Sequence, residues 1–154
     1  MYTYKRTIKS GDMIEVEYYQ SIRKLGKNYG GRKSNNSLSP AKMRKANKLR
    51  AVKHMQRLIN ANFGSGDFFC RFSAPYGTYE TEEEFRKEVG KLLYRINYRL
   101  KKQGKGRLKY IAFIECGKSG KNWHIHIIVS KEDRELLSEQ WPYENGQNFT
   151  PLYK

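Results

Sequence analysis

The sequence predicts an α+β fold in which a helix packs on a mostly antiparallel sheet. Three observations support this: apolar, strand-like runs over 68–73, 110–116 and 123–129, an amphipathic helical pattern between the first two, and a short loop between the last two. A short loop of this kind predicts an antiparallel hairpin. With 154 residues, of which 38% are hydrophobic, the chain has the size and apolar content of one compact domain.

The amino-terminal third predicts a strand, a loop and a helix. Residues 12–19 alternate apolar side chains with acidic or polar ones, the pattern of a half-buried strand. Segment 27–38 is polar and contains glycine, which predicts a loop. Ser39 is expected as the N-cap and Pro40 as the first residue of a helix that ends at about Asn62.

This first helix is expected to pack with one side and to present a cationic surface with the other. Its bases are Lys42, Arg44, Lys45, Lys48, Arg50, Lys53 and Arg57. Its apolar stripe is Met43, Ala46, Val52, Met55, Leu58 and Ile59. A basic amphipathic helix binds nucleic acid or an anionic membrane surface, and the stripe holds Met and Ala more than Trp or Phe, which favours nucleic acid.

The second helix has a clearer start. Thr81 and Glu84 fit a capping box, in which the Thr81 hydroxyl accepts from the Glu84 N–H and the Glu84 carboxylate reaches back. Apolar residues then recur at helical spacing: Phe85, Val89, Leu92, Leu93, Ile96 and Leu100. The pattern ends at Gly104, and acids at the amino end with bases at the carboxyl end suit the helix dipole.

The order of elements from residue 68 is β-α-β-β, which predicts one half of a ferredoxin-like or RRM-like sheet. A further helix is expected over 132–139, followed by an irregular tail from Trp141. Residues 1–62 are accordingly expected as a basic strand, loop and helix attached to or part of the core, and residues 63–154 as the core itself.

The charge is strongly positive and unevenly placed. The formal net charge is +16; residues 1–62 hold 15 Lys and Arg against three acids, a net +12, and residues 63–154 carry the other +4. A polyanion such as nucleic acid is the expected partner. No apolar stretch approaches the roughly 18 residues of a membrane span, and the first residues have no signal-peptide core, so a cytoplasmic protein without a membrane partner is expected.

Two of the three histidines, His124 and His126, lie in one strand-like run. Strand alternation places both imidazoles on one face, where they can converge on a metal ion. Glu115 is the only carboxylate between Glu88 and Glu132, and the hairpin brings it opposite or diagonal to the histidines. The alternative is that the histidines are surface residues and that a loop lysine neutralises Glu115. His54 is expected to be a surface or DNA-contact group.

The run from Lys109 to Val129 resembles the His-hydrophobic-His motif of HUH endonucleases. More narrowly, it resembles the replication-associated proteins of small phages and mobile elements that initiate rolling-circle replication. Residues 60–63, 68–73 and 75–77 also look like that group, so the resemblance covers most of residues 12–141.

The resemblance implies that Glu115, His124 and His126 hold Mg²⁺ or Mn²⁺, which polarises a scissile phosphate. It implies that a tyrosine attacks this phosphate, giving a 5′ phosphotyrosine and a free 3′ hydroxyl. Single-stranded or hairpin origin DNA is the implied substrate, with a host replication helicase or polymerase as a further partner. The bases expected to contact DNA are Arg71, Lys118, Lys121, Lys45, Lys48 and Lys53.

The nucleophile departs from the family pattern. In similar proteins it lies on a helix some tens of residues after the histidines, whereas 28 residues follow His126 here and contain only Tyr143 and Tyr153. We therefore expect that the nucleophile helix is missing from this chain, as in a fragment or truncated protein, with Tyr153 as the candidate within it.

The expected function is metal-dependent nicking and joining of single-stranded DNA at a replication or transfer origin. The alternative is a module that binds origin DNA without cutting it. A histidine-triad hydrolase is disfavoured because Ile128 stands where a third histidine is needed, and a small transposase because such chains usually extend much further.

Overall fold

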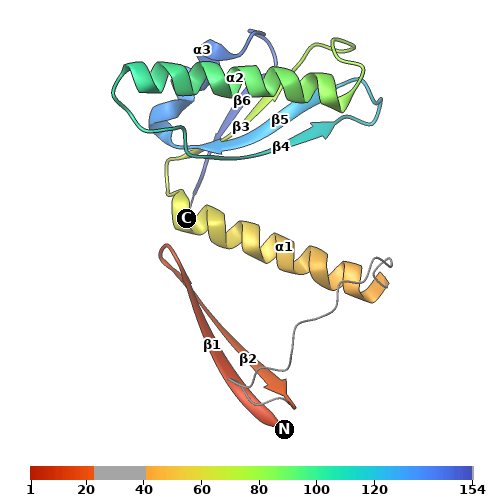
Figure 1. Cartoon of the computed structure of the whole chain (residues 1–154), viewed down its shortest axis with the longest axis vertical. Helices are drawn as coiled ribbons and strands as arrows, with labels where there is room; N and C mark the ends of the chain where they lie inside the picture. Colours follow the sequence, from red (N-terminus) through yellow and green to blue (C-terminus); the bar gives the residue numbers. More distant parts are fainter. Residues whose placement is uncertain (23–40, 154) are drawn as a thin grey trace. The chain divides into compact units, whose positions relative to one another are not determined.

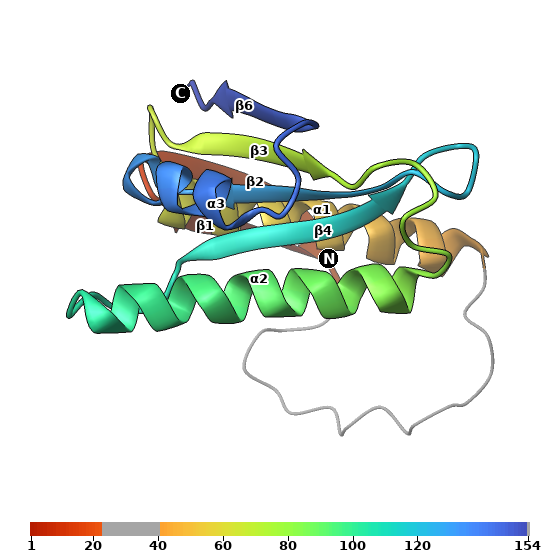
Figure 2. The same ribbon diagram turned by 90° about the horizontal axis from the view of Figure 1, so that it is seen from above.

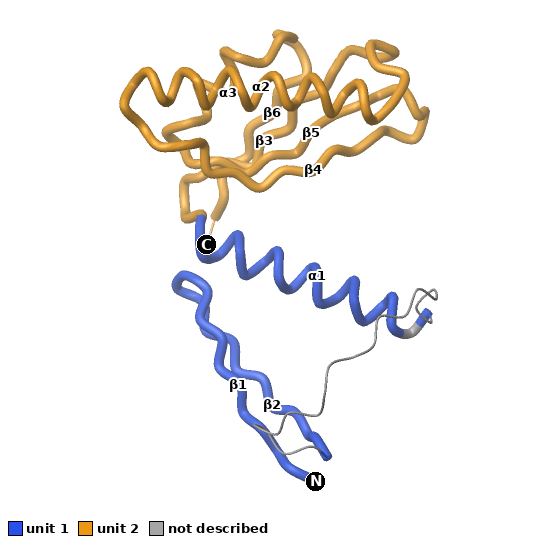
Figure 3. The backbone as a smooth tube through the Cα atoms, in the orientation of Figure 1, with its two compact units in different colours: residues 1–62 blue, residues 63–154 orange. Residues whose placement is uncertain are grey.

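The computed structural model describes residues 1–22 and 41–153 (Figure 1). The described elements are β1 (Tyr2–Ser10), β2 (Met13–Ser21), α1 (Ala41–Asn62), β3 (Phe68–Ser73), α2 (Glu82–Lys102), β4 (Tyr110–Cys116), β5 (Trp123–Val129), a 3₁₀ turn (Lys131–Asp133), α3 (Arg134–Gln140) and β6 (Gln147–Pro151). They form two compact units, unit 1 (residues 1–62) and unit 2 (residues 63–154) (Figure 3). The expected loop 27–38, Ser39 and Pro40 lie outside the described residues.

Unit 1 contains an antiparallel hairpin, β1–β2, and the helix α1. Strand β1 was not predicted from the sequence, because Arg6 interrupts the alternation of its less polar face, which holds Tyr2, Tyr4 and Ile8. Ser10 pairs with Met13, so only Gly11 and Asp12 form the turn. Gly11 adopts a φ of 59°, which a two-residue hairpin turn requires and which glycine adopts without strain.

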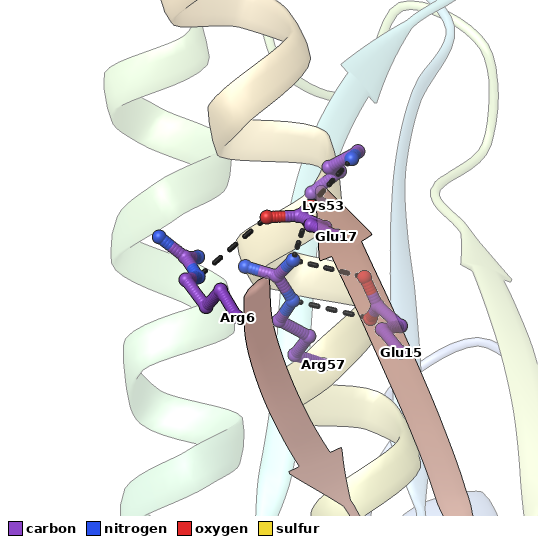
Figure 4. Close-up of polar contacts among 5 residues, drawn as sticks. All are labelled: Arg6, Glu15, Glu17, Lys53 and Arg57. Carbon is purple, nitrogen blue, oxygen red and sulfur yellow. Dashed lines mark hydrogen bonds and ion pairs between the residues drawn. The ribbon is translucent and has the colours of Figure 1, made fainter. Parts of the chain in front are cut away.

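Ion pairs join β2 to α1 inside unit 1 (Figure 4). Arg57 donates from Nε and Nη2 to the two Glu15 oxygens at 3.1 and 2.9 Å, and also from Nη2 to Glu17 at 3.2 Å. Lys53 donates to Glu17 at 2.9 Å, and Arg6 approaches the same carboxylate at 3.5 Å. The hydrogen bonds from Arg57 and Lys53 hold the pKa values of the Glu15 and Glu17 carboxyls, respectively, below their usual value.

The expected packing of α1 through its apolar stripe is wrong for much of the stripe. Val52, Met55 and Leu58 are exposed in the structure. The described hairpin instead meets α1 through carboxylates that pair with Lys53 and Arg57. Val52, Met55 and Leu58 therefore stay exposed while Met43, Ala46 and Ile59 are partly buried, and two of the bases expected on a free cationic surface, Lys53 and Arg57, are already neutralised.

Unit 2 is an antiparallel sheet in the order β4-β5-β3-β6, with α2 and α3 on one face (Figure 2). The expected antiparallel β4–β5 hairpin is confirmed. Inward side chains of β3 and β5 pack against α2 and α3. The largest fully buried side chains of this core are Phe72, Phe85, Leu92, Ile96, Ile125, Ile127 and Leu137. None of the helices in the described part of the chain is long and apolar enough to cross a membrane.

The start of α2 agrees with the capping prediction in part. The Thr81 hydroxyl accepts from the Glu84 N–H at 3.2 Å, as expected. The Glu84 carboxylate accepts from the N–H of Glu80, one residue before the expected one, at 3.0 Å. Cys70 is buried, which raises its thiol pKa to about 12, and Cys116 is half-buried.

The irregular segment expected from Trp141 is confirmed over 141–146, but the prediction is wrong from Gln147 onward. After α3, which begins two residues later than expected, the chain forms β6 alongside β3. Phe72 explains this arrangement, because its ring contacts Trp141 at 5.4 Å and Phe149 of β6 at 5.7 Å between centroids. A five-residue edge strand shows too few alternations to be recognised locally, and its position depends on contacts with β3.

We expect Phe72→Ala to lower the free energy of unfolding by roughly 3–5 kcal/mol, because it leaves a cavity between two aromatic rings in the core. Phe113→Ala is the matched control, because Phe113 is 44% exposed on the opposite face of the sheet and its loss should cost much less. Urea unfolding followed by circular dichroism measures both. Equal losses would contradict the assignment of the core to the α2 face.

Candidate metal centre

Glu115, His124 and His126 project from neighbouring strands onto the face of the sheet that α2 does not cover. Glu115 pairs directly with His124 across β4 and β5, and His126 is diagonal to Glu115. Ile125 and Ile127, which alternate with the histidines, are buried in the core against α2. Burial of the isoleucines therefore forces both imidazoles onto the open face.

The three side chains converge on one point. Glu115 Oε2 lies 3.0 Å from His126 Nε2 and 3.4 Å from His124 Nε2. One ligand atom from each residue lies within 4.8 Å of the others, so the group could hold a metal ion. Two imidazoles and one carboxylate are donors for a divalent ion, and three protein ligands leave further coordination positions open for water or substrate.

The surroundings of the two imidazoles favour the tautomer of His124 and the ring orientation of His126 in which Nε2 can bind a metal ion. His124 Nδ1 lies 3.3 Å from the Asn122 carbonyl oxygen, a contact that favours the proton on Nδ1 and the lone pair on Nε2. The His126 ring stacks on Phe113 and Phe69, with centroids 4.9 and 5.2 Å away. Its buried Nδ1 has no hydrogen-bond partner among the described residues, so ring stacking and the hydrogen bond between Nε2 and Glu115 orient the ring.

Electrostatics favour neutral imidazole at His126. Burial is the main cause of its lowered pKa, and repulsion from His124 adds to it. Glu115 acts in the opposite direction, and Arg71 contributes a further lowering. A neutral ring at pH 7 keeps the nitrogen lone pair that a metal ion needs.

Among the bases predicted to contact DNA, three lie in unit 2. Arg71 of β3 pairs with His126 across the sheet, is exposed, and faces the same side as the histidines. Lys118 and Lys121 are exposed in the loop between β4 and β5, close along the chain to Glu115 and His124. The N–H of Gly77 donates to the Lys121 carbonyl at 3.0 Å, which holds this loop beside the β3–α2 loop.

The other predicted bases lie on α1 in unit 1. Lys45 and Lys48 are exposed. Lys53 is ion-paired with Glu17, so its ammonium already has an anionic partner. His54 is exposed on the same helix.

The structure does not bring the two candidate tyrosines to the metal centre. The Tyr143 hydroxyl is hydrogen-bonded to the Tyr79 hydroxyl at 2.8 Å, and both rings pack against the core on the α2 side of the sheet. Tyr153 is 84% exposed and follows Leu152, which exchanges backbone hydrogen bonds with Asp67 and Gly66. β3 begins at Phe68, which is about 10 Å along the strand from Arg71, at roughly 3.3 Å per residue.

Sequence reasoning missed four side chains that share the open face with the cluster: Phe69, Phe113, Asn148 and Thr150. The signal for the two phenylalanines was available, because each lies two residues before a predicted site residue, Arg71 or Glu115, in its strand. Asn148 and Thr150 could not be placed without the pairing of β6 with β3.

Comparison with known families gave one match. Residues 77–150 match the model of a replication-associated protein family, the ORF2 type. The matched segment spans slightly less than half of the chain and includes α2, β4, β5 and α3, and therefore all of Glu115, His124 and His126. Neither the curated proteins nor the solved structures gave a significant match.

We expect the protein to bind Mn²⁺ in isothermal titration, and the double change His124→Ala with His126→Ala to remove this binding. The loss should exceed the roughly 10- to 100-fold that removal of an outer-shell partner costs. His54→Ala is the matched control and should bind as the parent does, because His54 is exposed on α1. Equal affinity of the parent and the double variant would contradict the metal centre.

Mn²⁺ affinity should also fall as the pH is lowered from 7 to 5, because protons compete for the imidazole nitrogens. The lowered pKa of His126 delays its own protonation to a pH below the usual value of 6.5. The same titration repeated at several pH values measures this. An affinity independent of pH over this range would exclude imidazole ligands.

Proposed function

We propose that unit 2 is an HUH-type endonuclease core and that the protein nicks and rejoins single-stranded DNA at a replication or transfer origin. The observation that supports this best is the convergence of Glu115, His124 and His126 on the open face of a sheet, within the segment that matches a replication-associated family. Metal-dependent phosphoryl transfer requires such a site, with positions left open for the phosphate.

The topology supports the same proposal. Unit 2 runs β-α-β-β-α-β, and the strand that follows the first helix lies at the opposite edge of the sheet from the last strand. This is the order of a ferredoxin-like fold, which carries both helices on one face and leaves the other free for a ligand.

The divalent ion, Mg²⁺ or Mn²⁺, would act as a Lewis acid on the scissile phosphate. In this proposal Arg71 of β3 binds a neighbouring phosphate, as do Lys118 and Lys121 of the hairpin loop. In the proposed step the phenolic oxygen of a tyrosine bonds to phosphorus and the bond to the 3′ oxygen breaks. That oxygen takes up a proton, and joining is the reverse reaction.

The open face also suits an unpaired strand. Phe113 is exposed beside His126, and Phe69 lies next to it, with ring centroids 6.4 Å apart. Unpaired bases stack on aromatic rings while cationic side chains follow the phosphates. Phe69 and Phe113 together with Arg71 therefore favour single-stranded DNA over duplex as the substrate at this face.

Tyr153 is the proposed nucleophile within the described residues, and it can act only after the segment following β6 moves. The backbone hydrogen bonds of Leu152 with Asp67 and Gly66, at 2.7 and 3.0 Å, would have to break first. An attacking phenol must be held near the phosphorus, about 3–3.5 Å away, which a strand end at the far side of the sheet does not achieve.

This placement of the tyrosines favours a second candidate function, an origin-binding module that does not cut. Such a module would use the same bases and aromatic rings, and the metal ion would hold a phosphate without chemistry. The two functions differ in one observable, a covalent protein–DNA product.

If Tyr153 is the nucleophile, a covalent adduct should form when the chain is incubated with labelled single-stranded origin DNA and Mn²⁺ and run on denaturing gels. His126→Ala should abolish the adduct, because the metal ion loses a ligand, whereas His54→Ala should not. Tyr153→Phe should abolish it without reducing Mn²⁺ affinity.

An adduct that survives Tyr153→Phe would move the nucleophile to another tyrosine. Tyr76, exposed next to Gly77 at the hairpin loop, would be tested first. No adduct from the parent at any metal concentration, with DNA binding intact, would contradict the nuclease and support the binding module.

DNA binding should weaken steeply with salt, and part of this dependence should come from α1. Lys45→Gln with Lys48→Gln should reduce the slope of log affinity against log salt by about 1.4, at about 0.7 for each lost contact with single-stranded phosphate. Lys53→Gln should change the slope less, because Lys53 is already paired with Glu17. Fluorescence anisotropy with a labelled oligonucleotide measures this; a larger effect of Lys53 would contradict the assignment.

A further inference from the structure

We propose that unit 2 has a second binding site for single-stranded nucleic acid, on the outer side of α2, formed by Tyr94, Tyr98 and the bases around them. The sheet separates this surface from the metal centre, because α2 covers one face and Glu115 and the histidines lie on the other. The site is not needed for the proposed nicking chemistry, and it holds no residue of that chemistry.

Two tyrosines on α2 are exposed and take no part in the hydrophobic core. Tyr94 and Tyr98 are 72% and 50% exposed. Each follows a buried residue, Leu92 or Ile96, by two positions, which is about 200° around a helix and therefore points away from the sheet. Their rings are nearly parallel, with an interplanar angle of 15° and centroids 6.5 Å apart. Both rings are therefore accessible to solvent on the outer side of α2.

A cavity of about 550 Å³ adjoins these rings. The residues that line it are Tyr94, Asn97, Tyr98, Lys101, Lys105, Gly106 and Arg107. Three of them are bases and none is acidic. A hollow of this composition fits an anionic ligand that also has flat aromatic groups, which is the chemistry of a nucleotide strand.

The wall of the cavity is held by hydrogen bonds. At the end of α2, Gly104 has a φ of 71°, and the N–H groups of Gly104 and Lys105 donate to Lys101 and Leu100. This Schellman motif turns the chain back along the helix. Asn97 then accepts from the Leu108 N–H at 2.9 Å and donates to the Leu93 carbonyl at 2.8 Å. The segment that carries Lys105 and Arg107 is therefore fixed beside the tyrosines.

The positive charge at this site is not neutralised. Elsewhere on α2, bases pair with acids: Lys91 and Arg95 with Glu88, and Arg99 with Glu139. Lys101, Lys105 and Arg107 form no ion pair within the residues that the structure describes.

Lys102 adds to the charge beside the rings, because its ammonium lies 4.8 Å from the centroid of the Tyr98 ring. Four cations beside two exposed tyrosines provide phosphate contacts and stacking surfaces together. Stacking requires an unpaired base, so a single strand fits the site better than duplex DNA.

The direct test is ultraviolet cross-linking of the full chain to a twelve-nucleotide oligothymidine that contains 4-thiothymidine, followed by mass spectrometry of the peptides. We expect cross-links at Tyr94 or Tyr98. The same experiment with a matched RNA strand shows whether the site binds RNA or DNA. Absence of cross-links at both tyrosines, together with the affinity result below, overturns the proposal.

In fluorescence anisotropy, Tyr94→Ala with Tyr98→Ala should weaken oligothymidine binding about 5- to 150-fold, the effect of losing one stacked base. Tyr94→Phe with Tyr98→Phe keeps the rings and should bind as the parent does. An unchanged affinity of the alanine variant overturns the proposal. Mn²⁺ affinity of each variant should stay unchanged, which separates this site from the metal centre and from the nicking proposal.

Variants that remove charge test the phosphate contacts separately from the stacking. Lys101→Gln with Lys105→Gln should lower the salt slope by about 1.4. Arg86→Gln with Lys87→Gln is the matched control, because these two bases lie on α2 but are paired with Glu82 and Glu83.

A labelled oligoglutamate is the competing probe. If it binds as tightly as the oligonucleotide, and if its affinity falls as much in the tyrosine-to-alanine variant, the site recognises acidic peptides and the assignment to nucleic acid is wrong.

Discussion

The antiparallel pairing of β4 with β5 is the constraint on which the candidate metal centre depends. It sets Glu115 directly opposite His124 and diagonal to His126, so three side chains with little sequence separation share one point above the sheet. The register cannot shift by one residue, because such a shift would bury both imidazoles and expose Ile125 and Ile127. The same hydrophobic burial that stabilises unit 2 therefore positions the ligands.

The centre combines opposed electrostatic effects. Glu115 attracts positive charge to the histidines, while burial and mutual repulsion keep His126 neutral. The negative charge of Glu115 is then not balanced by the neutral His126 imidazole. A divalent cation would neutralise this charge and bind the imidazole nitrogens without the need to protonate them. Phe69 and Phe113 stack on the His126 ring, whose Nδ1 has no hydrogen-bond partner among the described residues, and this stacking links the ligand geometry to the aromatic rings of the open face.

Unit 2 presents different chemistry on its two sides, although aromatic rings and bases occur on both. The open face of the sheet adds two imidazoles and a carboxylate, the groups that can hold a metal ion. The outer side of α2 offers tyrosines and unpaired lysines with no such cluster among the described residues. The proposed nicking chemistry and the proposed second strand-binding site therefore use opposite sides of one small sheet.

The sequence by itself determined the features that depend on neighbours along the chain. Alternation placed His124 and His126 on one face, the scarcity of carboxylates identified Glu115, and the capping residue Thr81 marked the start of α2. Only the tertiary structure decided which strands lie side by side. The edge strand β6, the exposure of Val52 and Met55 on α1, and the wall held by Asn97 all depend on hydrogen bonds, packing or ion pairs between segments distant in sequence, which local periodicity does not encode.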